Sequence, residues 1–321
     1  MSITPATRVT SHTPNDGSSM GDPWKFSLHG GHSGDFCLHG SDTLNEVVEA
    51  AIKFGYSSFG ITPHAPRSSG QFLYPEEVEA GYEPLDLMRD FEACVAAARD
   101  LATEYAEDIE ILVGTELEVV PADSYADEVA VLRKQFDLDY VIGSIHWVDD
   151  VPIDVTQPLF DAAVTGRGGL ERFLIRYYEL VADMTNAITP EIIGHLDLPK
   201  LMSRTHVLNA GLALPSVLDD AINSALLAVK RAGSIIEVNT RSIAKGLPEP
   251  YPSDWLINRV NELEIPIGFS DDSHDATQVG ENFEAGVNQL QSLGITEVTK
   301  LTRSAGELTR RTVSLPTPNS L

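Results

Sequence analysis

The chain has 321 residues, of which 42% are hydrophobic and 22% charged, so it can form one large soluble domain or two small ones. Its 48 acidic residues outnumber 22 basic ones, which gives a net charge of -26. A field of that sign repels nucleic acid and anionic membranes. A phosphorylated substrate would therefore need local positive charge, which metal ions could supply.

The cysteines and the chain ends are consistent with a cytoplasmic protein. Cys37 and Cys94 are the only cysteines, so no disulfide framework is implied. The N-terminal stretch has no apolar signal region, and no run of the sequence is apolar enough to cross a membrane. Because both ends are rich in Ser, Thr, Pro and Asn, we expect flexible tails over 1–22 and 313–321 around one domain over 23–312.

Short apolar runs that predict strands alternate with longer helical patterns along this domain. The predicted strands are 24–31, 56–62, 109–120, 138–148, 191–198, 234–240 and 265–274. The predicted helices are 43–55, 85–106, 124–136, 170–187, 216–233, 253–264, 281–294 and 297–312. Strand followed by helix, repeated along the whole chain, predicts a parallel sheet, and the number of repeats favours a closed (β/α) barrel. Neither a dinucleotide-binding nor a Walker phosphate-binding glycine motif is present.

Nearly every predicted strand ends in side chains that can bind a metal ion. These residues are His29, His32, His39, His64, Glu116, His146, His195, Asp272 and His274. In a (β/α) barrel the carboxyl ends of all strands converge on one face, so these residues are expected to meet there. Only His12 and His206 lie elsewhere, and no role is expected for either.

The residue types indicate which ions such a face would bind. Imidazoles mixed with carboxylates, without a thiolate pair, suit Zn²⁺, Mn²⁺ or Fe²⁺. The ligands are too many for one ion, so we expect two or three divalent ions, with Glu116 bridging two of them. Such ions would supply hydroxide at neutral pH and neutralise the charge of a transferring phosphoryl group.

Several motifs in their order resemble a known family. They are HSGDFCLHG (32–40), ITPHAPR (61–67), VGTELE (113–118), YVIGSIHWV with the following PID (140–154), IGHLDLPK (193–200), IEVNT with EPYPS (236–253) and SDDSHDATQVG (270–280). Together they resemble the PHP (polymerase and histidinol phosphatase) superfamily, and within it the histidinol-phosphate phosphatases of histidine biosynthesis. The resemblance implies a single-domain distorted (β/α)7 TIM-like barrel of PHP type. It also implies hydrolysis of L-histidinol phosphate to L-histidinol and phosphate by metal-bound hydroxide.

The resemblance further implies three ligand sets and some neighbouring groups. One ion would take His32, Glu116 and Asp272, a second Glu116, His146 and His195, and a third His39, His64 and His274. Arg67 and Lys200 would contact the substrate phosphate. Asp197 would orient a ligand or protonate the leaving group, with a purely structural hydrogen bond as the equal alternative. Arg241 and Lys245 are further basic candidates that match no motif of the family.

The first motif departs from the family pattern. The family usually has His-x-His, but here Gly30 occupies the expected first position and His29 lies one residue too early. Residues three apart on a strand do not share a face. Gly30 and Gly31 could permit a bulge that brings His29 back to the metal. The alternative is a site with one ligand fewer.

Other functions remain open from the sequence. The chain could act on another phosphomonoester or a phosphodiester, although its charge weighs against nucleic acid. It could also be a metal-binding barrel without activity. A metal-dependent amidohydrolase fits less well, because its metal-bridging lysine has no counterpart. No nucleic acid or membrane partner is expected, and the oligomeric state is not predicted.

Overall fold

The computed structural model describes residues 22–203 and 215–317. The predicted N-terminal tail, apart from its last residue, lies outside the described residues, as do His12 and His206. None of the helices within these ranges is long and apolar enough to cross a membrane.

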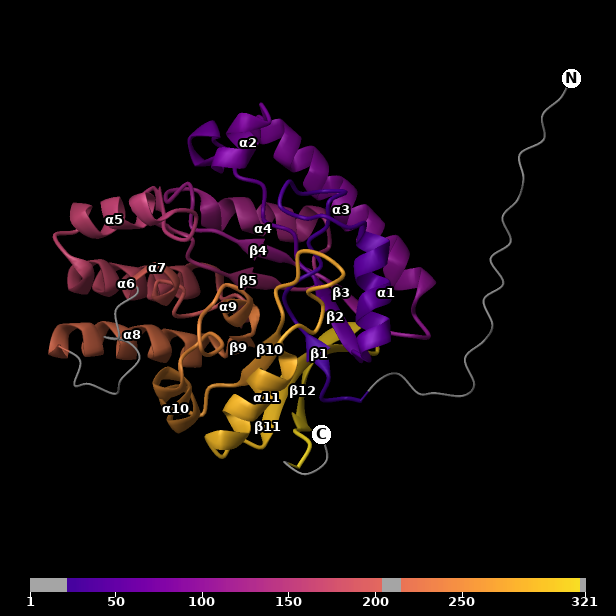
Figure 1. The fold of residues 1–321 in the computed structure, drawn as a ribbon. Coiled ribbons are helices and arrows are strands. Elements are labelled where there is room, and N and C mark those ends of the chain that lie inside the picture. Colours follow the sequence, from indigo (N-terminus) through magenta and orange to yellow (C-terminus); the bar gives the residue numbers. More distant parts are fainter. Residues whose placement is uncertain (1–21, 204–214, 318–321) are drawn as a thin grey trace, which may run out of the picture.

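Eight short parallel strands form the centre of the molecule in two sheets (Figure 1). The first sheet has the order β1-β2-β3. The second has the order β10-β9-β8-β5-β4. The strands are β1 (Phe26–Ser27), β2 (Ser58–Ile61), β3 (Glu110–Val113), β4 (Thr115–Leu117), β5 (Val141–Gly143), β8 (Ile192–Ile193), β9 (Ile235–Asn239) and β10 (Ile267–Ser270).

Backbone hydrogen bonds join the two sheets into a ring. On one side the Leu28 N–H donates to the Phe269 carbonyl at 2.9 Å, which connects the chain after β1 to β10. On the other side, the single strand predicted over 109–120 bends at Gly114 and divides into β3 and β4, so it contributes to both sheets. Since β3 and β4 form one position of the ring, the fold is the expected distorted (β/α)7 barrel.

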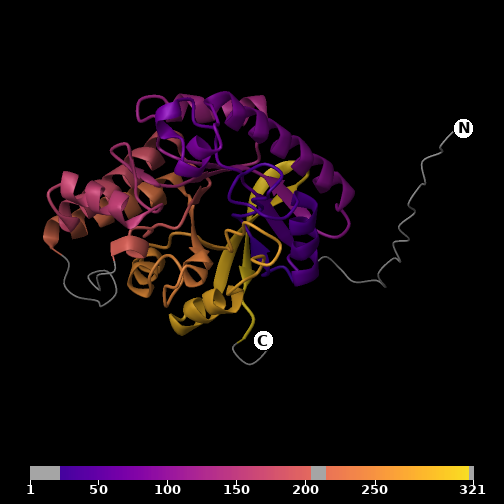
Figure 2. The same ribbon diagram turned by 45° about the horizontal axis from the view of Figure 1, so that its top comes forward.

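Helices surround the strands as an outer layer (Figure 2). The helix α1 illustrates why the sequence folds this way, because Thr43 and Glu46 form a capping box at its start and Gly55 ends it in a left-handed conformation. The longer helices are α1 (Leu44–Phe54), α3 (Pro84–Glu104), α4 (Tyr125–Gln135), α5 (Gln157–Gly166), α6 (Leu170–Ile188), α8 (Ser216–Ala232), α10 (Asp254–Glu262) and α11 (Phe283–Ser292).

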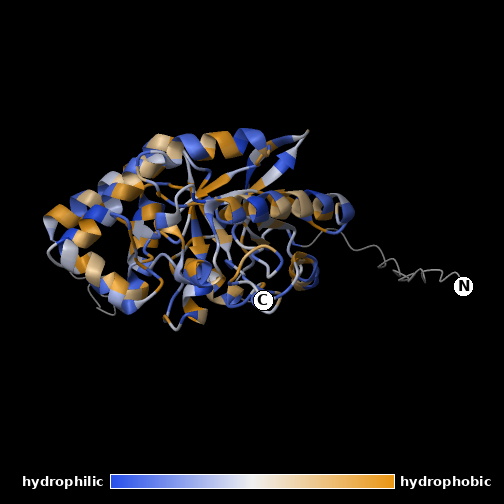
Figure 3. Ribbon diagram, turned by 90° about the horizontal axis from the view of Figure 1, so that it is seen from above, coloured by the Kyte–Doolittle hydropathy of each residue, from blue (hydrophilic) through white to orange (hydrophobic). Residues whose placement is uncertain are grey.

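Shorter elements lie in the loops after the strands. They are the 3₁₀-helix η1 (Gly70–Phe72), α2 (Pro75–Glu79), the antiparallel pair β6 (Trp147–Val148) and β7 (Val151–Pro152), α7 (Lys200–Ser203) and α9 (Arg241–Ala244). Figure 3 shows apolar residues concentrated on the central strands and on one side of the surrounding helices. Strands of a parallel barrel are covered on both faces, which explains their continuous apolar runs.

The last helix predicted from the sequence is wrong. Residues 297–312 lie instead in an antiparallel hairpin of β11 (Glu297–Ser304) and β12 (Glu307–Ser314). Val298, Leu301 and Leu308 imitate helical spacing, but Ala305 and Gly306 both have positive φ, as a two-residue hairpin turn requires. The strand continues to Ser314 and Leu315 is buried, so the folded domain extends beyond residue 312.

The hairpin covers the amino-terminal end of the barrel, opposite the carboxyl ends of the strands. The buried Lys300 donates to Ser57 Oγ at 3.0 Å, and Thr302 donates to Glu110 at 2.8 Å.

Leu301→Ala should lower the free energy of unfolding by about 2–4 kcal/mol, because the Leu301 side chain is buried in the core. Thr312→Ala, at an exposed hairpin position, should change it by less than about 0.5 kcal/mol. Urea unfolding of both variants tests this packing. Equal decreases in the free energy of unfolding of the two variants would contradict it.

Candidate metal centre

The carboxyl ends of the barrel strands surround a cavity of about 260 Å³, which we call the cup. Its lining combines imidazoles and carboxylates with two basic side chains and a few aromatic and aliphatic ones. The lining residues are His39, His64, Tyr74, Glu76, Glu116, His146, Asp154, Val155, His195, Leu198, Arg241, Lys245, Tyr251, Asp272 and His274. Residues from opposite ends of the sequence thus meet at one face, as expected for a barrel.

The two glycines after β1 bring His29 into this face. Gly30 and Gly31 have φ of 152° and 72°, which side-chain-bearing residues rarely adopt. A Cβ on Gly30 would lie 2.8 Å from Ser273 Oγ, and one on Gly31 would lie 3.0 Å from the Ile61 side chain. The resulting turn places the buried His29 Nε2 at 3.2 Å from Glu116. His29 therefore reaches the cluster despite its shifted position in the sequence.

Glu116 is the central carboxylate of the cluster. Its Oε1 lies 3.0 Å from His195 Nε2 and 3.5 Å from His146 Nε2. Its Oε2 lies 3.2 Å from His64 Nδ1. Burial alone would raise the pKa of Glu116, but the His29 and His146 charges lower it well below its ordinary value. An ionised carboxylate among four imidazoles has the composition of a bridging metal ligand.

A second group of imidazoles lies beside the first. The rings of His32 and His274 stack with their centroids 4.3 Å apart. The ring centroid of His39 lies 5.8 Å from that of His32 and 5.0 Å from that of His274. Asp272 adopts a left-handed φ of 51°, which brings Oδ1 to 3.7 Å from His274 Nδ1 and 3.8 Å from His29 Nε2. Backbone strain of this kind is concentrated at functional sites.

The structure brings the nine predicted ligands to one face but groups most of them differently from the three implied sets, and Asp272 belongs to none of these groups. Glu116, His146 and His195 form a group whose ligand atoms lie within 4.8 Å of one another, as implied. His32 groups with His39 and His274, and also with His29 and Glu116. The remaining groups join His64 to Glu118 and His146, and His29 to His195 and Glu237.

Three of the histidines are in the neutral form that can bind a divalent cation. Burial lowers the pKa of His39 to about 2 and that of His274 to about 4, the latter against the opposing charge of Asp272. Burial also lowers the pKa of His32 well below its usual value. Its Nε2 is buried without a hydrogen-bond partner in the described part of the chain. Neutral imidazoles with a free lone pair are the form that binds metal.

Sequence reasoning missed two buried carboxylates that support these ligands. Glu118 Oε1 lies 3.1 Å from His146 Nδ1 and accepts a hydrogen bond from the Tyr74 hydroxyl at 2.6 Å. Glu237 lies 3.2 Å from His29 Nδ1 and accepts from the His195 N–H at 2.8 Å. A carboxylate on the second imidazole nitrogen fixes the tautomer and orientation of a metal-binding histidine. A signal was present for Glu237, which interrupts the apolar run of β9.

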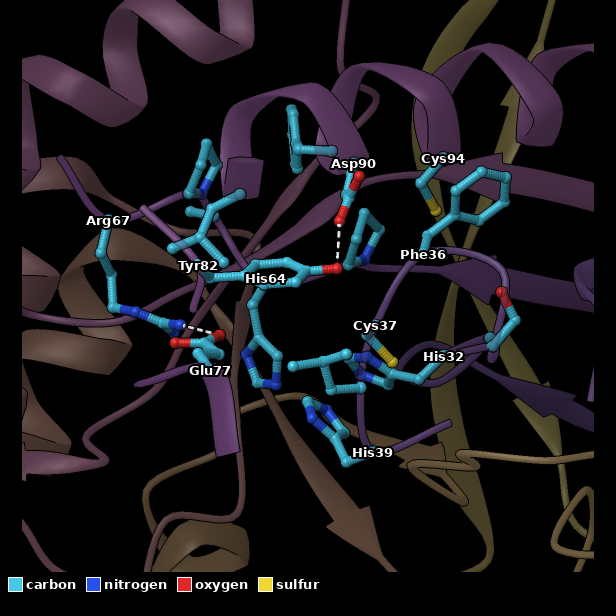
Figure 4. A pocket seen from close by; sticks show the side chains of 18 residues that line it. His32, Phe36, Cys37, His39, His64, Arg67, Glu77, Tyr82, Asp90 and Cys94 are labelled. Atoms are coloured by element: carbon cyan, nitrogen blue, oxygen red, sulfur yellow. Dashed lines mark hydrogen bonds and ion pairs between the residues drawn. The ribbon is translucent and has the colours of Figure 1, made fainter. Parts of the chain in front are cut away.

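Arg67, one of the predicted phosphate contacts, does not line the cup. Arg67 is buried, lies 3.1 Å from Glu118 Oε2 and forms a second ion pair with Glu77. Figure 4 shows the Arg67 guanidinium turned toward Glu77. Its charge is thus paired inside the protein, and its contact with a substrate phosphate stays a prediction.

Asp197 and Lys200 are buried and do not line the cup. Lys200 Nζ donates to the Pro250 carbonyl at 2.6 Å and lies 3.3 Å from Asp197. Asp197 accepts from the N–H and hydroxyl of Ser253 at 2.8 and 2.7 Å. These contacts agree with the structural alternative for Asp197, and its catalytic role stays a prediction. The basic residues that do line the cup are Arg241 and Lys245, which matched no motif.

Comparisons with known proteins identify the family. The PHP domain model matches residues 29–241. A Schizosaccharomyces pombe protein named "Probable histidinol-phosphatase" is 35% identical over 268 residues, which cover 83% of this chain and 86% of that protein. The chain belongs to the PHP domain family. A histidinol-phosphatase of Saccharomyces cerevisiae is 29% identical, over 78% of this chain and 84% of that one.

Solved structures show the same PHP fold. A Listeria monocytogenes protein described as a candidate histidinol phosphatase superposes with a TM-score of 0.70 at 22% identity, covering 81% of this chain and 99% of that one. The histidinol phosphate phosphatase of Lactococcus lactis, solved with Zn, L-histidinol and phosphate, gives a TM-score of 0.58 at 16% identity. It covers 89% of this chain and 99% of the Lactococcus chain.

Metal binding by this PHP protein should release protons. Burial alone would lower the pKa of His146, but the charges of Glu116 and Asp154 and a hydrogen bond to Glu118 raise it to about 9. Below that pH a cation must displace the proton, so affinity should rise with pH up to about 9. Calorimetry of the chelator-stripped protein near pH 7, in two buffers of different ionisation enthalpy, measures this release. Equal heats of Zn²⁺ binding in both buffers would contradict the prediction.

Proposed function

We propose that this PHP protein hydrolyses L-histidinol phosphate to L-histidinol and phosphate with two or three divalent ions, Zn²⁺, Mn²⁺ or Fe²⁺. The observation that carries the proposal is the convergence of nine candidate metal ligands at the carboxyl ends of the strands, seven of them lining the cup, in a chain related to histidinol-phosphatases. The proposed ligands are His29, His32, His39, His64, Glu116, His146, His195, Asp272 and His274. The proposal places the enzyme in the cytoplasm with a small metabolite as its substrate.

The cations would supply an activated water and neutralise charge on the phosphoryl group. The residues of the chain have separate tasks. Glu118 and Glu237 hold His146 and His29 in the tautomers that direct Nε2 into the cluster. Arg241 and Lys245 give this acidic protein two positive charges at the cup, where phosphate oxygens would bind.

An assay of phosphate release tests the proposed function. The purified protein, with its metal content measured, should release phosphate from L-histidinol phosphate, stop after chelation, and recover when Zn²⁺ or Mn²⁺ is returned. A panel of phosphomonoesters and a phosphodiester assayed in parallel should give lower kcat/KM. A fully metal-loaded protein that leaves histidinol phosphate intact while it cleaves another ester would refute the substrate assignment.

A further inference from the structure

The side chain of Asn239 is a buried amide at the end of β9, between two carboxylates of the candidate metal centre. Its Nδ2 donates to Glu237 Oε1 at 2.9 Å and to Asp272 Oδ2 at 3.2 Å. Its Oδ1 accepts a hydrogen bond from the Arg241 N–H at 3.0 Å. Because a backbone N–H can only donate, this last contact fixes the orientation of the amide and turns its NH2 group toward the carboxylates.

The backbone of Asn239 is held by the segments on both sides of it. Its N–H donates to the Tyr251 carbonyl at 2.7 Å, and its carbonyl accepts from the Tyr251 N–H at 2.9 Å. On the other side Asn239 is the register partner of Ser270 in β10, and the Thr240 N–H donates to the Ser270 carbonyl at 3.1 Å. A residue whose backbone is fixed in this way can hold the groups that its side chain contacts.

The amide distinguishes the two carboxylate oxygens of Asp272. Oδ2 accepts from Asn239, whereas Oδ1 lies 3.7 Å from His274 Nδ1 and 3.8 Å from His29 Nε2. The left-handed φ of Asp272 is an unfavourable conformation that persists only where surrounding contacts hold it. The contact with Asn239 therefore secures the arrangement in which Oδ1 faces the imidazoles.

Glu237, the other acceptor of the amide, is itself held by several donors. Its Oε1 accepts from the His195 N–H at 2.8 Å, and its Oε2 accepts from the Ser270 hydroxyl at 2.8 Å. His29 Nδ1 lies 3.2 Å from each oxygen. Since both oxygens have protein partners, Glu237 is a fixed carboxylate, and the Asn239 amide links Asp272 to it.

We propose that Asn239 is a positioning residue of the metal centre, which holds Asp272 so that its Oδ1 is the oxygen that binds a cation. This inference rests on the proposed metal-dependent function, but it concerns metal affinity and not the choice of ester. Groups that orient a metal ligand typically contribute about 10–100-fold to metal affinity or activity. Without the amide, the Asp272 carboxylate loses the donor that keeps Oδ2 away from the imidazoles.

Asn239→Leu tests the proposal, because leucine has the same branching but no polar atom. The chelator-stripped protein is titrated with Zn²⁺ against a competing chelator, without any ester present. The dissociation constant of at least one Zn²⁺ should rise about 10–100-fold. Because Asn239 acts through Asp272, the same replacement in an Asp272→Asn background should raise that constant by less than about three-fold. A residue with a purely structural role would weaken binding equally in both backgrounds.

Asn223→Leu is the matched control, since Asn223 also donates its amide to a carboxylate, Asp219 at 3.3 Å, but within the outer helix α8. It should leave the Zn²⁺ dissociation constants within about two-fold. Asn239→Ser is the second test variant, because its single hydroxyl can donate to at most one carboxylate and its small size avoids overpacking. It should weaken Zn²⁺ binding in the same direction, and circular dichroism of the stripped variants verifies their folding.

Wild-type Zn²⁺ affinity in a folded Asn239 variant would overturn the proposal. An undiminished loss in the Asp272→Asn background would overturn it as well, because Asn239 would then act independently of that carboxylate. Failure of the wild-type protein to hydrolyse L-histidinol phosphate would instead refute the proposed substrate, and the titration, which contains no ester, would still decide the role of Asn239.

Discussion

Glu116→Gln should reduce kcat on phosphomonoesters by about 10³-fold and lower the bound metal by at least one ion per chain. The glutamate lies within 3.5 Å of imidazole nitrogens from four histidines, and it is the only carboxylate in that position among the described residues. Metal ions contribute several kcal/mol of transition-state stabilisation, and each 1.36 kcal/mol corresponds to about ten-fold in rate. Glutamine keeps the volume but removes the charge that would hold two cations together.

Glu191→Gln is the matched control for this experiment. Glu191 is also a partly buried carboxylate, but it pairs with Arg133 at 2.7 Å near the amino-terminal end of β8, away from the cup. Its replacement should leave metal content and kcat within about two-fold. Elemental analysis and steady-state kinetics on both variants give the result. A Glu116→Gln protein with full metal content and wild-type turnover would remove Glu116 from the centre of the site.

Arg67→Met should lower the free energy of unfolding by about 3–5 kcal/mol, because it leaves the buried Glu118 carboxylate without its cation. Burial alone would raise the pKa of Glu118, but the Arg67 charge lowers it well below its ordinary value, so the carboxylate stays ionised near neutral pH. At a temperature where the variant remains folded, KM for the phosphate ester should change less than about three-fold. Urea unfolding and initial-rate kinetics provide the two measurements.

Arg89→Met provides the comparison for Arg67. Arg89 pairs with Asp86 and Asp90 on the surface of α3, where its side chain is 62% exposed. Exposed ion pairs contribute little to stability, so the loss of Arg89 should change the free energy of unfolding far less than the loss of Arg67. If Arg67→Met kept wild-type stability and raised KM strongly instead, the arginine would contact the substrate phosphate, as the resemblance implied, and its structural role would be wrong.

The barrel could be predicted from the sequence because apolar strand-like runs alternate regularly with helical patterns. The convergence of the proposed ligands could be predicted because they stand at the ends of these runs. Apolar runs such as 265–270 followed by Asp272 and His274 indicate strands that end at a polar face, and a closed parallel barrel places all such ends together. The position of His29 was left open because it depends on the dihedral angles of Gly30 and Gly31. Strand alternation alone could not provide these angles.

Other features depended on contacts that sequence spacing does not encode. Arg67 and Lys200 stand within motifs, but a motif does not show whether a cation faces the cup or a buried carboxylate. Arg241 and Lys245 lie outside any motif and reach the cup because α9 follows β9 directly. The C-terminal hairpin was mistaken for a helix because its apolar spacing fits both structures. The positive φ at Ala305, which a hairpin turn needs, is uncommon for a residue other than glycine.

Anomalous X-ray scattering from crystals of the active, metal-loaded protein locates the cations. Two or three anomalous peaks should lie at the cup, each about 2.0–2.2 Å from nitrogen or oxygen atoms of the nine proposed ligands. Glu116 should contact two of these peaks. An active protein whose metal peaks lie outside the cup, or whose cup holds no peak, would contradict the proposed metal centre.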